Sequence, residues 1–296
     1  MSGVLGTVRA LVATSRPLSW INTAYPFAAV VVLTTGRIDA ALVVGTLFFL
    51  VPYNLLMYGV NDVFDHASDV ANPRKGGVEG ALLPTRLHRA ALVWSVTLAA
   101  PFVVALLVLG AARPWSWAVL ALSLFAVVAY SVPGLRFKEI PVLDSLTSSV
   151  HFVSPALYGL ALAGTEITPP IVVAMVAFLL WGMASHAFGA VQDIVPDREA
   201  GIGSVATALG GAATVRLAVL LWTGAGVLVA FTPWPAALAA LAAVPYVASA
   251  WPYLRVSDEA SGAVNRAWRR FLAINYATGC ALTILLILCA REGLFS

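Results

Sequence analysis

Charge is scarce in this sequence. Asp, Glu, Lys and Arg together make up 10% of its 296 residues, whereas soluble globular domains carry about 25%. Hydrophobic residues account for 60% of the chain, and the mean hydropathy is +0.91. Such a composition excludes an ordinary soluble domain and predicts an integral membrane protein.

Cysteine is almost absent, and long polar segments are missing. The two cysteines, Cys280 and Cys289, lie nine residues apart in one apolar run. On a helix they would occupy opposite faces, about 13 Å apart along the axis, so we expect no disulfide between them. The longest stretch between apolar runs, 61–87, is too short for a soluble domain. We therefore expect a single transmembrane domain over 1–296.

Apolar runs of roughly 18 to 25 residues recur along the chain, the length that crosses ~30 Å of hydrocarbon as a helix. We expect an all-α integral membrane protein with nine transmembrane helices in a single bundle. The first run contains Pro26 and no small-residue cleavage site, which indicates a retained helix and not a signal peptide. The expected spans are about 18–35, 40–60, 88–111, 115–132, 141–163, 169–190, 212–231, 235–252 and 268–290.

The cations are distributed unevenly between alternate loops. With nine spans, fourteen of the seventeen Lys and Arg residues fall at the N-terminus and in the loops after spans two, four, six and eight. The other side holds only Arg37, Arg113 and Arg291. Because positively charged loops stay in the cytoplasm, we expect a multi-pass protein of the cell membrane with a cytoplasmic N-terminus and an external C-terminus. The same loops explain the net charge of +3, so no nucleic-acid partner is expected.

The few acidic residues are clustered. The stretch NDVFDHASD at the end of the second span carries Asn61, Asp62, Asp65 and Asp69. On a helix these four side chains fall within an arc of roughly 100°. Three carboxylates so close repel one another unless a cation neutralises them. Oxygen ligands without cysteine or a histidine pair favour a hard ion, so we expect Mg²⁺ at this cluster.

A second acidic pair follows the sixth span. The stretch VQDIVPDREAG places Asp193 and Asp197 four residues apart, on one face if the helix continues. Pro196 tends to kink or end a helix, so Asp197 is also compatible with a turn. A solvated helix end explains a single aspartate, but five of the fourteen acidic residues lie in these two clusters. Two acidic faces that hold Mg²⁺ are an arrangement that binds a diphosphate.

Basic and hydroxyl side chains accompany the acidic clusters. The stretches NPRKGG and YSVPGLRFKEIP follow the second and fourth spans, and they supply Arg74, Lys75, Tyr130, Ser131, Arg136 and Lys138. Arg and Lys can offset the charge of a departing diphosphate. Cytoplasmic topology explains part of this charge as well.

If the group that carries the diphosphate is allylic, departure of the diphosphate leaves a carbocation. This carbocation has to be kept away from water. Aromatic rings can stabilise such a cation, although packing is the ordinary role of aromatic residues in membrane helices. The candidate aromatic residues are Tyr53, Tyr58, Phe64, Phe152 and Trp181. Polar residues in or near apolar spans are candidates for removing a proton or positioning water, or are hydrogen-bonded structural residues: Asp144, His151 and His186.

Three patterns resemble the UbiA superfamily of intramembrane prenyltransferases: Asn-Asp-x-x-Asp-x-x-x-Asp at 61–69, Tyr-Ser-x-Pro-x-x-Arg-x-Lys at 130–138 and Asp-x-x-x-Asp-Arg-Glu at 193–199. The resemblance covers all nine expected spans. Together with the residues above, it implies Mg²⁺ ligands at Asp62, Asp65, Asp69, Asp193 and Asp197. It implies diphosphate contacts from Asn61, Arg74, Lys75, Ser131, Arg136, Lys138 and Arg198. Catalytic roles are expected for Asp65, Tyr130, Asp144 and His151.

Within that superfamily, YNLLMYGVNDVFDHASDVANPRKGGVEGALL and VQDIVPDREAGIGSVATALG are similar to the branch of lycopene elongases and hydratases. This resemblance implies transfer of the dimethylallyl group of dimethylallyl diphosphate to lycopene, within the lipid bilayer, followed by proton loss or water uptake. An aromatic acid, a quinone precursor, a chlorophyllide or a glycerophosphate stays open as the acceptor. A cation transporter with intramembrane aspartates and a cyclase of the terpene synthase type also stay open.

Overall fold

The computed structural model describes residues 3–71 and 82–294, and the regular secondary structure in these two ranges is helical. Nine helical segments in them are long and apolar enough to cross a membrane, which confirms the all-helical fold class and the number of candidate spans. They are Val4–Thr35, Ala40–Phe64, Thr85–Leu109, Pro114–Ser131, Leu143–Ala163, Pro169–Val191, Gly211–Ala230, Ala236–Tyr253 and Ser261–Arg291. The first segment begins well before the predicted span because it includes an additional N-terminal helix.

The chain divides into two compact units. Unit 1 comprises Met1–Phe137 and Ser154–Thr165, and unit 2 comprises Lys138–Val153 and Glu166–Ser296. The division falls inside one helix, α8 (Leu143–Ala163), whose first part belongs to unit 2 and whose last part belongs to unit 1. The single domain expected over 1–296 stays a prediction.

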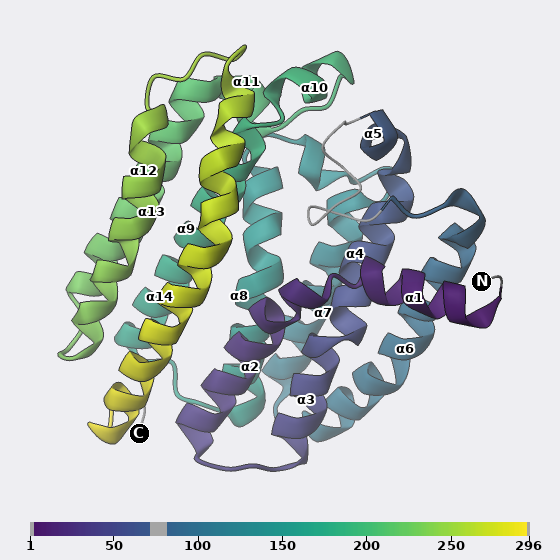
Figure 1. Cartoon of the computed structure of the whole chain (residues 1–296). Coiled ribbons are helices and arrows are strands. Elements are labelled where there is room, and N and C mark those ends of the chain that lie inside the picture. Colours follow the sequence, from purple (N-terminus) through teal and green to yellow (C-terminus); the bar gives the residue numbers. More distant parts are fainter. Residues whose placement is uncertain (1–2, 72–81, 295–296) are drawn as a thin grey trace. The chain divides into compact units, whose positions relative to one another are not determined.

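Unit 1 is a bundle of helices from the first half of the chain (Figure 1). Besides the end of α8 it contains α1 (Val4–Thr14), η1 (Pro17–Ser19), α2 (Trp20–Thr35), α3 (Ala40–Leu50), α4 (Pro52–Phe64), α5 (His66–Ala71), η2 (Thr85–Leu87), α6 (His88–Leu109) and α7 (Pro114–Ser131). The proline at the start of α4 and of α7 occupies a position where its missing N–H is not needed.

Aromatic side chains form the core of unit 1. Phe27, Phe48, Phe49, Tyr53 and Tyr158 are each 0% exposed. The ring centroid of Phe49 lies 5.3 Å from that of Phe27 and 5.2 Å from that of Tyr53, within the usual range for aromatic pairs. Tyr53, a candidate for stabilising a carbocation, is therefore part of the packed core.

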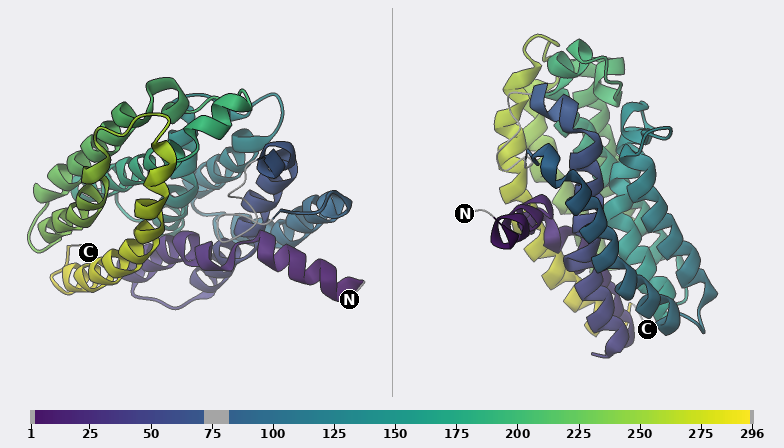
Figure 2. Two further views of the ribbon diagram at one scale, coloured as in Figure 1. Left: turned by 45° about the horizontal axis from the view of Figure 1, so that its top comes forward. Right: turned by 90° about the vertical axis from the view of Figure 1, so that its right-hand side faces the viewer.

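The N-terminal helix α1 lies outside the predicted spans. Figures 1 and 2 show that it runs across the direction of α4. Val4, Leu5 and Val8 of this helix are 82%, 67% and 49% exposed. Its 11 residues are too few to cross a membrane, and a short helix with an exposed apolar face is typical of the membrane interface.

Unit 2 consists of helices from the second half of the chain, among which α9 and α12 pack along each other (Figure 1). Besides the start of α8, its elements are α9 (Pro169–Val191), α10 (Ile194–Glu199), α11 (Val205–Leu209), α12 (Gly211–Ala230), η4 (Ala236–Ala242), α13 (Ala243–Ala250), η5 (Trp251–Tyr253), η6 (Ser261–Val264) and α14 (Asn265–Arg291). A further short helix, η3 (Phe137–Glu139), lies where the two units meet in the sequence.

The core of unit 2 is also aromatic. Phe188 and Trp222 are each 1% exposed, and Tyr246 and Phe271 pack with them. Trp181, another candidate for stabilising a carbocation, lies 5.8 Å from Tyr246 between ring centroids. Both cysteines are free, which confirms that Cys280 and Cys289 do not pair.

Candidate functional site

The first acidic motif lies where a long helix of unit 1 ends. Helix α4 ends at Phe64, Asp65 is its C-cap residue, and α5 begins at the next residue. The expected single helix is thus interrupted at Asp65, because Asp favours helix caps over helix interiors. The helical spacing still continues, since the Asp65 amide donates to the Asn61 carbonyl and the Asp69 amide donates to the Asp65 carbonyl, each at 2.9 Å. Asp62, Asp65 and Asp69 are 2%, 5% and 9% exposed.

Arg16 reaches this motif from the segment between α1 and α2. Its Nη2 atom donates to Asp62 Oδ1 at 2.8 Å, and its guanidinium carbon lies 4.1 Å from the centroid of the Tyr58 ring. A cation over a ring face is an attractive arrangement. From the sequence, Arg16 is one loop cation among fourteen, and no motif marks it; the fold brings it to Asp62 across 46 residues.

The last residue of α7 and the turn after it bring two of the expected residues to the same motif. Ser131 Oγ donates to Asn61 Oδ1 at 2.9 Å. Arg136 Nη1 donates to the Phe64 carbonyl at 3.5 Å, and its Nη2 lies 3.9 Å from Asp65 Oδ1. Unit 1 therefore holds a buried carboxylate group flanked by two arginines. The diphosphate contacts of Ser131 and Arg136 stay predictions.

The second acidic motif lies where a long helix of unit 2 ends. Helix α9 ends at Val191, Asp193 is the N-cap residue of α10, and the Asp197 amide donates to the Asp193 carbonyl at 2.9 Å. Pro196 is the third residue of α10, a position where no intrahelical N–H bond is lost. The interruption therefore comes before the proline, and not at it as the sequence suggested.

The two motifs share one local geometry. In each, a long helix ends, an aspartate occupies the junction, and a six-residue helix follows with a second aspartate as its fourth residue. Asp65 and Asp69 in unit 1 thus correspond to Asp193 and Asp197 in unit 2. Each junction aspartate accepts, through its carbonyl, the amide of the second one. The chain builds the same acidic helix end twice.

Arg198, an expected diphosphate contact, ties three segments of unit 2 together. Its Nη1 donates to Asp258 Oδ2 at 2.6 Å, and its Nη2 donates to the Thr207 carbonyl at 2.9 Å. Asp258 Oδ1 in turn accepts the Gly211 amide at 2.6 Å. The Gly211 amide and then Arg198 lower the pKa of the Asp258 carboxyl below its ordinary value. Binding of diphosphate by Arg198 stays a prediction.

The junction in unit 2 is held by a partly buried contact between two side-chain amides. Asn265, the first residue of α14, donates through Nδ2 to Gln192 Oε1 at 2.6 Å. Gln192 directly precedes Asp193, so this bond anchors the end of α9 to the start of α14. Neither amide was a candidate from the sequence, because neither belongs to a recognisable motif.

A third polar group lies within the spans of unit 2. Asp144 is 0% exposed, and its two oxygens accept the amides of Ser145 and Val205, each at 2.7 Å. Ser145 Oγ lies 3.2 Å from His186 Nδ1, within hydrogen-bonding distance. His151 lies deeper in α8 and is 3% exposed. Catalytic roles of Asp144 and His151 stay predictions.

The other expected residues are placed as follows. Tyr130 is half-buried near the end of α7, and Lys138 is half-buried in η3. Arg74 and Lys75 lie outside the described residues. Their roles stay predictions.

The carboxylates fit a magnesium ion by their chemistry. Mg²⁺ prefers hard oxygen ligands, and proteins usually hold it through one or two carboxylates together with substrate phosphates and waters. Within residues 3–71 and 82–294, no three His, Cys, Asp or Glu side chains converge to hold a metal ion by themselves. Each motif instead offers buried or half-buried aspartates four residues apart, which suits an ion that completes its shell with diphosphate oxygens.

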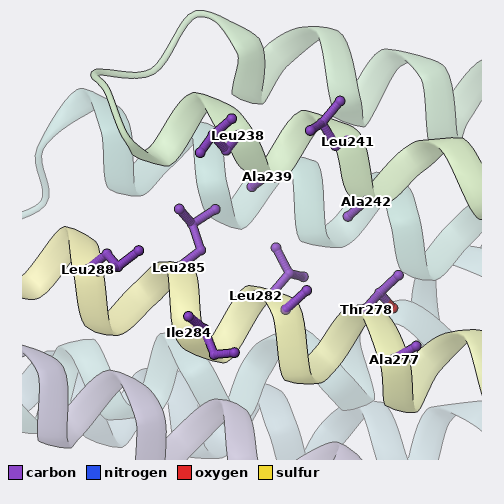
Figure 3. Close-up of a pocket in the computed structure, with 11 residues that line it drawn as sticks. Leu238, Ala239, Leu241, Ala242, Ala277, Thr278, Leu282, Ile284, Leu285 and Leu288 are labelled. Carbon is purple, nitrogen blue, oxygen red and sulfur yellow. The ribbon is translucent and has the colours of Figure 1, made fainter.

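An apolar groove of about 450 Å³ lies elsewhere in unit 2, between η4 and α14 (Figure 3). Leu238 and Leu241 line one side, and Leu282 and Leu285 line the other. It begins twelve residues after Asn265, about 18 Å along α14 from the second acidic motif. The groove therefore does not belong to the candidate site.

The chain belongs to the UbiA prenyltransferase family, whose model matches residues 23–276. It is thus a multi-pass membrane prenyltransferase with a UbiA-like fold. The solved structure of a UbiA homolog from Archaeoglobus fulgidus, bound to DMAPP and Mg²⁺, is 18% identical in sequence and has a TM-score of 0.66. That likeness covers 90% of this chain and 98% of the other, and it concerns the fold.

Two curated relatives are more similar in sequence. The lycopene elongase/hydratase of Corynebacterium glutamicum is 48% identical over 280 residues, which cover 95% of this chain and 97% of that protein. The C(50) beta-cyclic carotenoids biosynthesis protein LbtBC of Dietzia sp. (strain CQ4) is 52% identical over 282 residues. The chain spans 65% of the length of that protein.

Proposed function

We propose that this protein is a lycopene elongase, which transfers the dimethylallyl group of dimethylallyl diphosphate to an end of lycopene in C50 carotenoid biosynthesis and hydrates the resulting cation. The observation that carries the proposal is the repeated acidic helix end, with Arg16 and Arg136 beside its first copy. Its similarity to a lycopene elongase/hydratase over nearly the full length of both chains supports the choice of acceptor.

The diphosphate is expected at the two acidic helix ends. Mg²⁺, when bound there, neutralises the diphosphate oxygens and makes the diphosphate a better leaving group. The ligands would be Asp62, Asp65 and Asp69 of the first motif and Asp193 and Asp197 of the second. Asn61 and Ser131 orient the first motif, since they are hydrogen-bonded to each other.

Cationic side chains have a second role in this proposal. Arg136 lies beside Asp65, and a guanidinium can bind two diphosphate oxygens at once. As the C–O bond breaks, negative charge grows on the departing diphosphate. A fixed cation therefore stabilises the transition state of this step more than it stabilises the bound substrate. Lys138, Arg74 and Lys75 are expected to add to this positive field.

The carbon skeleton reacts in the membrane. The dimethylallyl cation has to meet a carbon–carbon double bond before it meets water, and spans surrounded by hydrocarbon exclude water from the reaction. Lycopene is itself apolar and dissolves in the bilayer. Tyr58, Phe64 and Phe152 stay candidates for contact with the cation, whereas Tyr53 and Trp181 lie in aromatic cores.

The orientation in the membrane belongs to the same proposal. The excess of cations on alternate loops favours a cytoplasmic location for the N-terminus and both acidic motifs, with the C-terminus outside. Dimethylallyl diphosphate is charged and soluble, so it would reach the site from the cytoplasm. A cation transporter would instead place its aspartates near the middle of the bilayer, whereas these aspartates lie at helix ends.

The test uses purified full-length protein in lipid vesicles with Mg²⁺, dimethylallyl diphosphate and lycopene, and products are identified by mass. We expect Asp65→Asn and Asp193→Asn each to lower turnover by about 10²-fold or more, and the double variant to lose no more than either one, because residues that act as a unit are not additive. Asp39→Asn is the matched control. Asp39 caps α3 through the Leu42 amide, and Asn caps helices as well as Asp.

Three results would count against the proposal. Elongation of an aromatic acceptor but not of lycopene would reassign the acceptor. A cyclic product formed without any acceptor would indicate a cyclase. Near-normal turnover in Asp65→Asn or Asp193→Asn would remove the metal assignment.

A further inference from the structure

One polar group inside the spans of unit 2 is not used by the diphosphate site. It consists of Asp144 and Ser145 on the first turn of α8 and His186 on α9. Polar side chains in hydrocarbon are costly unless they serve a purpose or are well paired. Ser145 Oγ lies 3.2 Å from His186 Nδ1, and the Asp144 carboxylate interacts electrostatically with the His186 ring.

Asp144 has a structural role. Its Oδ1 accepts the Ser145 amide and its Oδ2 accepts the Val205 amide, each at 2.7 Å. Both carboxylate oxygens are therefore occupied by backbone donors. Asp144 therefore holds the start of α11 against the start of α8.

His186 is the least buried of the three polar candidates. Asp144 and His151 are 0% and 3% exposed, whereas His186 is half-buried. The contact of Nδ1 with a serine hydroxyl orients the ring. When Nδ1 donates its proton to the hydroxyl, Nε2 carries the free lone pair, and it is this tautomer that can accept a proton.

The position of His186 along α9 suits contact with a cation formed near the second acidic motif. Helix α9 continues for five residues beyond His186, to Val191, so the imidazole is attached roughly 8 Å along the axis from the helix end that precedes Asp193. The direction from Asp193 to His186 leads from the end of α9 into the membrane. A cation formed on a chain that reacts just below the second acidic motif would come within reach of this imidazole.

We propose that His186 is the general base of the hydration step, with Ser145 and Asp144 as positioning residues. The inference rests on the proposed function. A terminal double bond of lycopene gives its electron pair to the allylic carbon, the C–O bond to diphosphate having broken with its electrons, and a tertiary cation remains on the carotenoid. The oxygen of a water molecule then bonds to that carbon while His186 Nε2 takes one proton from it. The imidazolium later returns the proton to solvent.

The competing outcome is loss of a proton from a carbon next to the cation, which gives an alkene. Both products come from one cation, so the hydrated fraction of all elongated product reports on the last step alone. A defect in folding, substrate binding or ionisation lowers the total product but does not change this fraction. A purely structural role of His186 would therefore leave the hydrated fraction unchanged.

The experiment measures this fraction by mass for the wild-type protein in vesicles with lycopene, dimethylallyl diphosphate and Mg²⁺, in water enriched in ¹⁸O. We expect the wild-type hydrated product to carry the label. His186→Gln keeps a polar side chain that cannot accept the proton, so its hydrated fraction should fall by about tenfold or more. Ser145→Ala should lower the fraction less, and Ser145→Thr, which keeps the hydroxyl, should restore it.

Ser149→Ala is the matched control, because Ser149 lies on the same helix but donates to the Leu179 carbonyl; its fraction should equal that of the wild type. If His186→Gln does not fold, the test is the comparison of Ser145→Ala with Ser145→Thr. Equal hydrated fractions in these two variants overturn the proposal. An unchanged fraction in folded His186→Gln overturns it too, as does a wild-type protein that forms only the alkene. No elongated lycopene from the wild type would instead contradict the proposed function, and the base assignment with it.

Discussion

Two arginines of unit 1, Arg16 and Arg136, have backbone φ angles of 52° and 42°. A left-handed conformation costs an L-residue about 1–2 kcal/mol, and it persists where surrounding contacts outweigh it. Both guanidinium groups reach carboxylates of the first acidic motif, Asp62 and Asp65. The strained backbone is therefore part of how unit 1 gathers positive charge at that motif.

Loss of the Arg16 side chain should weaken unit 1. Arg16→Ala removes the bond to Asp62 and the contact with the Tyr58 ring, and we expect a cost of about 2 kcal/mol, or roughly 4–8 °C in Tm. The Tm of Arg16→Lys should lie between that of the wild type and that of Arg16→Ala, because an ammonium keeps the charge but not the planar geometry. The measurement is thermal unfolding in detergent.

Arg9→Ala is the control for this series, since Arg9 is an exposed cation on α1. A double-mutant cycle of Arg16→Ala with Asp62→Asn isolates the interaction energy between Arg16 and Asp62 from the other effects of each substitution. If Arg16→Ala lowers Tm no more than Arg9→Ala, or if the cycle is additive, the ion pair contributes nothing to stability.

At the residue scale, the sequence indicates the acidic motifs because Asp is rare in an apolar chain. It also indicates Ser131 and Arg136, because they lie in the basic stretch YSVPGLRFKEIP. It does not reveal Arg16 or the pair of Gln192 and Asn265, since these contacts join residues 46 and 73 positions apart. Which cation of many meets which carboxylate is decided by helix packing.

At the scale of elements, hydropathy predicts the spans well and their interruptions poorly. A run of apolar residues predicts a membrane span, and all nine candidate spans in the described ranges have such a run. The junctions at Asp65 and Asp193 depend on local backbone hydrogen bonds, which apolar periodicity does not report. Helix α1 was missed for a related reason: its 11 residues form too short a run to predict a span.

The packing of α2 on α3 depends on one small residue. A Cβ atom at Gly45 would overlap the ring of Phe27, and that ring is 0% exposed and packed against Phe49 and Tyr158. Because the ring has no room to move, we expect Gly45→Ala to cost about 1–3 kcal/mol. Small residues at such contacts let membrane helices approach closely.

Thermal unfolding in detergent checks this prediction, with Gly224→Ala as the control. Gly224 lies within α12, and nothing is within 4 Å of the position its Cβ would take. Alanine favours a helix over glycine by about 1 kcal/mol, so the control should be neutral or stabilising. Equal effects of the two substitutions would mean that the α2–α3 contact tolerates a larger residue.

At the scale of the whole molecule, the proposed chemistry requires both acidic motifs to face one compartment. An odd number of spans puts the two termini on opposite sides, and the positive loops decide which side is cytoplasmic. With nine spans, Asp65 and Asp193 follow the second and the sixth span. Both even-numbered crossings return the chain to the side of the N-terminus, so one reagent should reach both motifs from the same side.

Labelling of single cysteines in intact cells tests this arrangement. In a chain with Cys280→Ala and Cys289→Ala, we expect cysteines at the exposed positions Arg37, Ala112 and Glu166 to react with a membrane-impermeant maleimide. Cysteines at Ala67 and Glu199, beside the two motifs, should react only after the membrane is permeabilised. Reaction of one of these two from outside and of the other only from inside would place the motifs in different leaflets, where they cannot hold the same diphosphate.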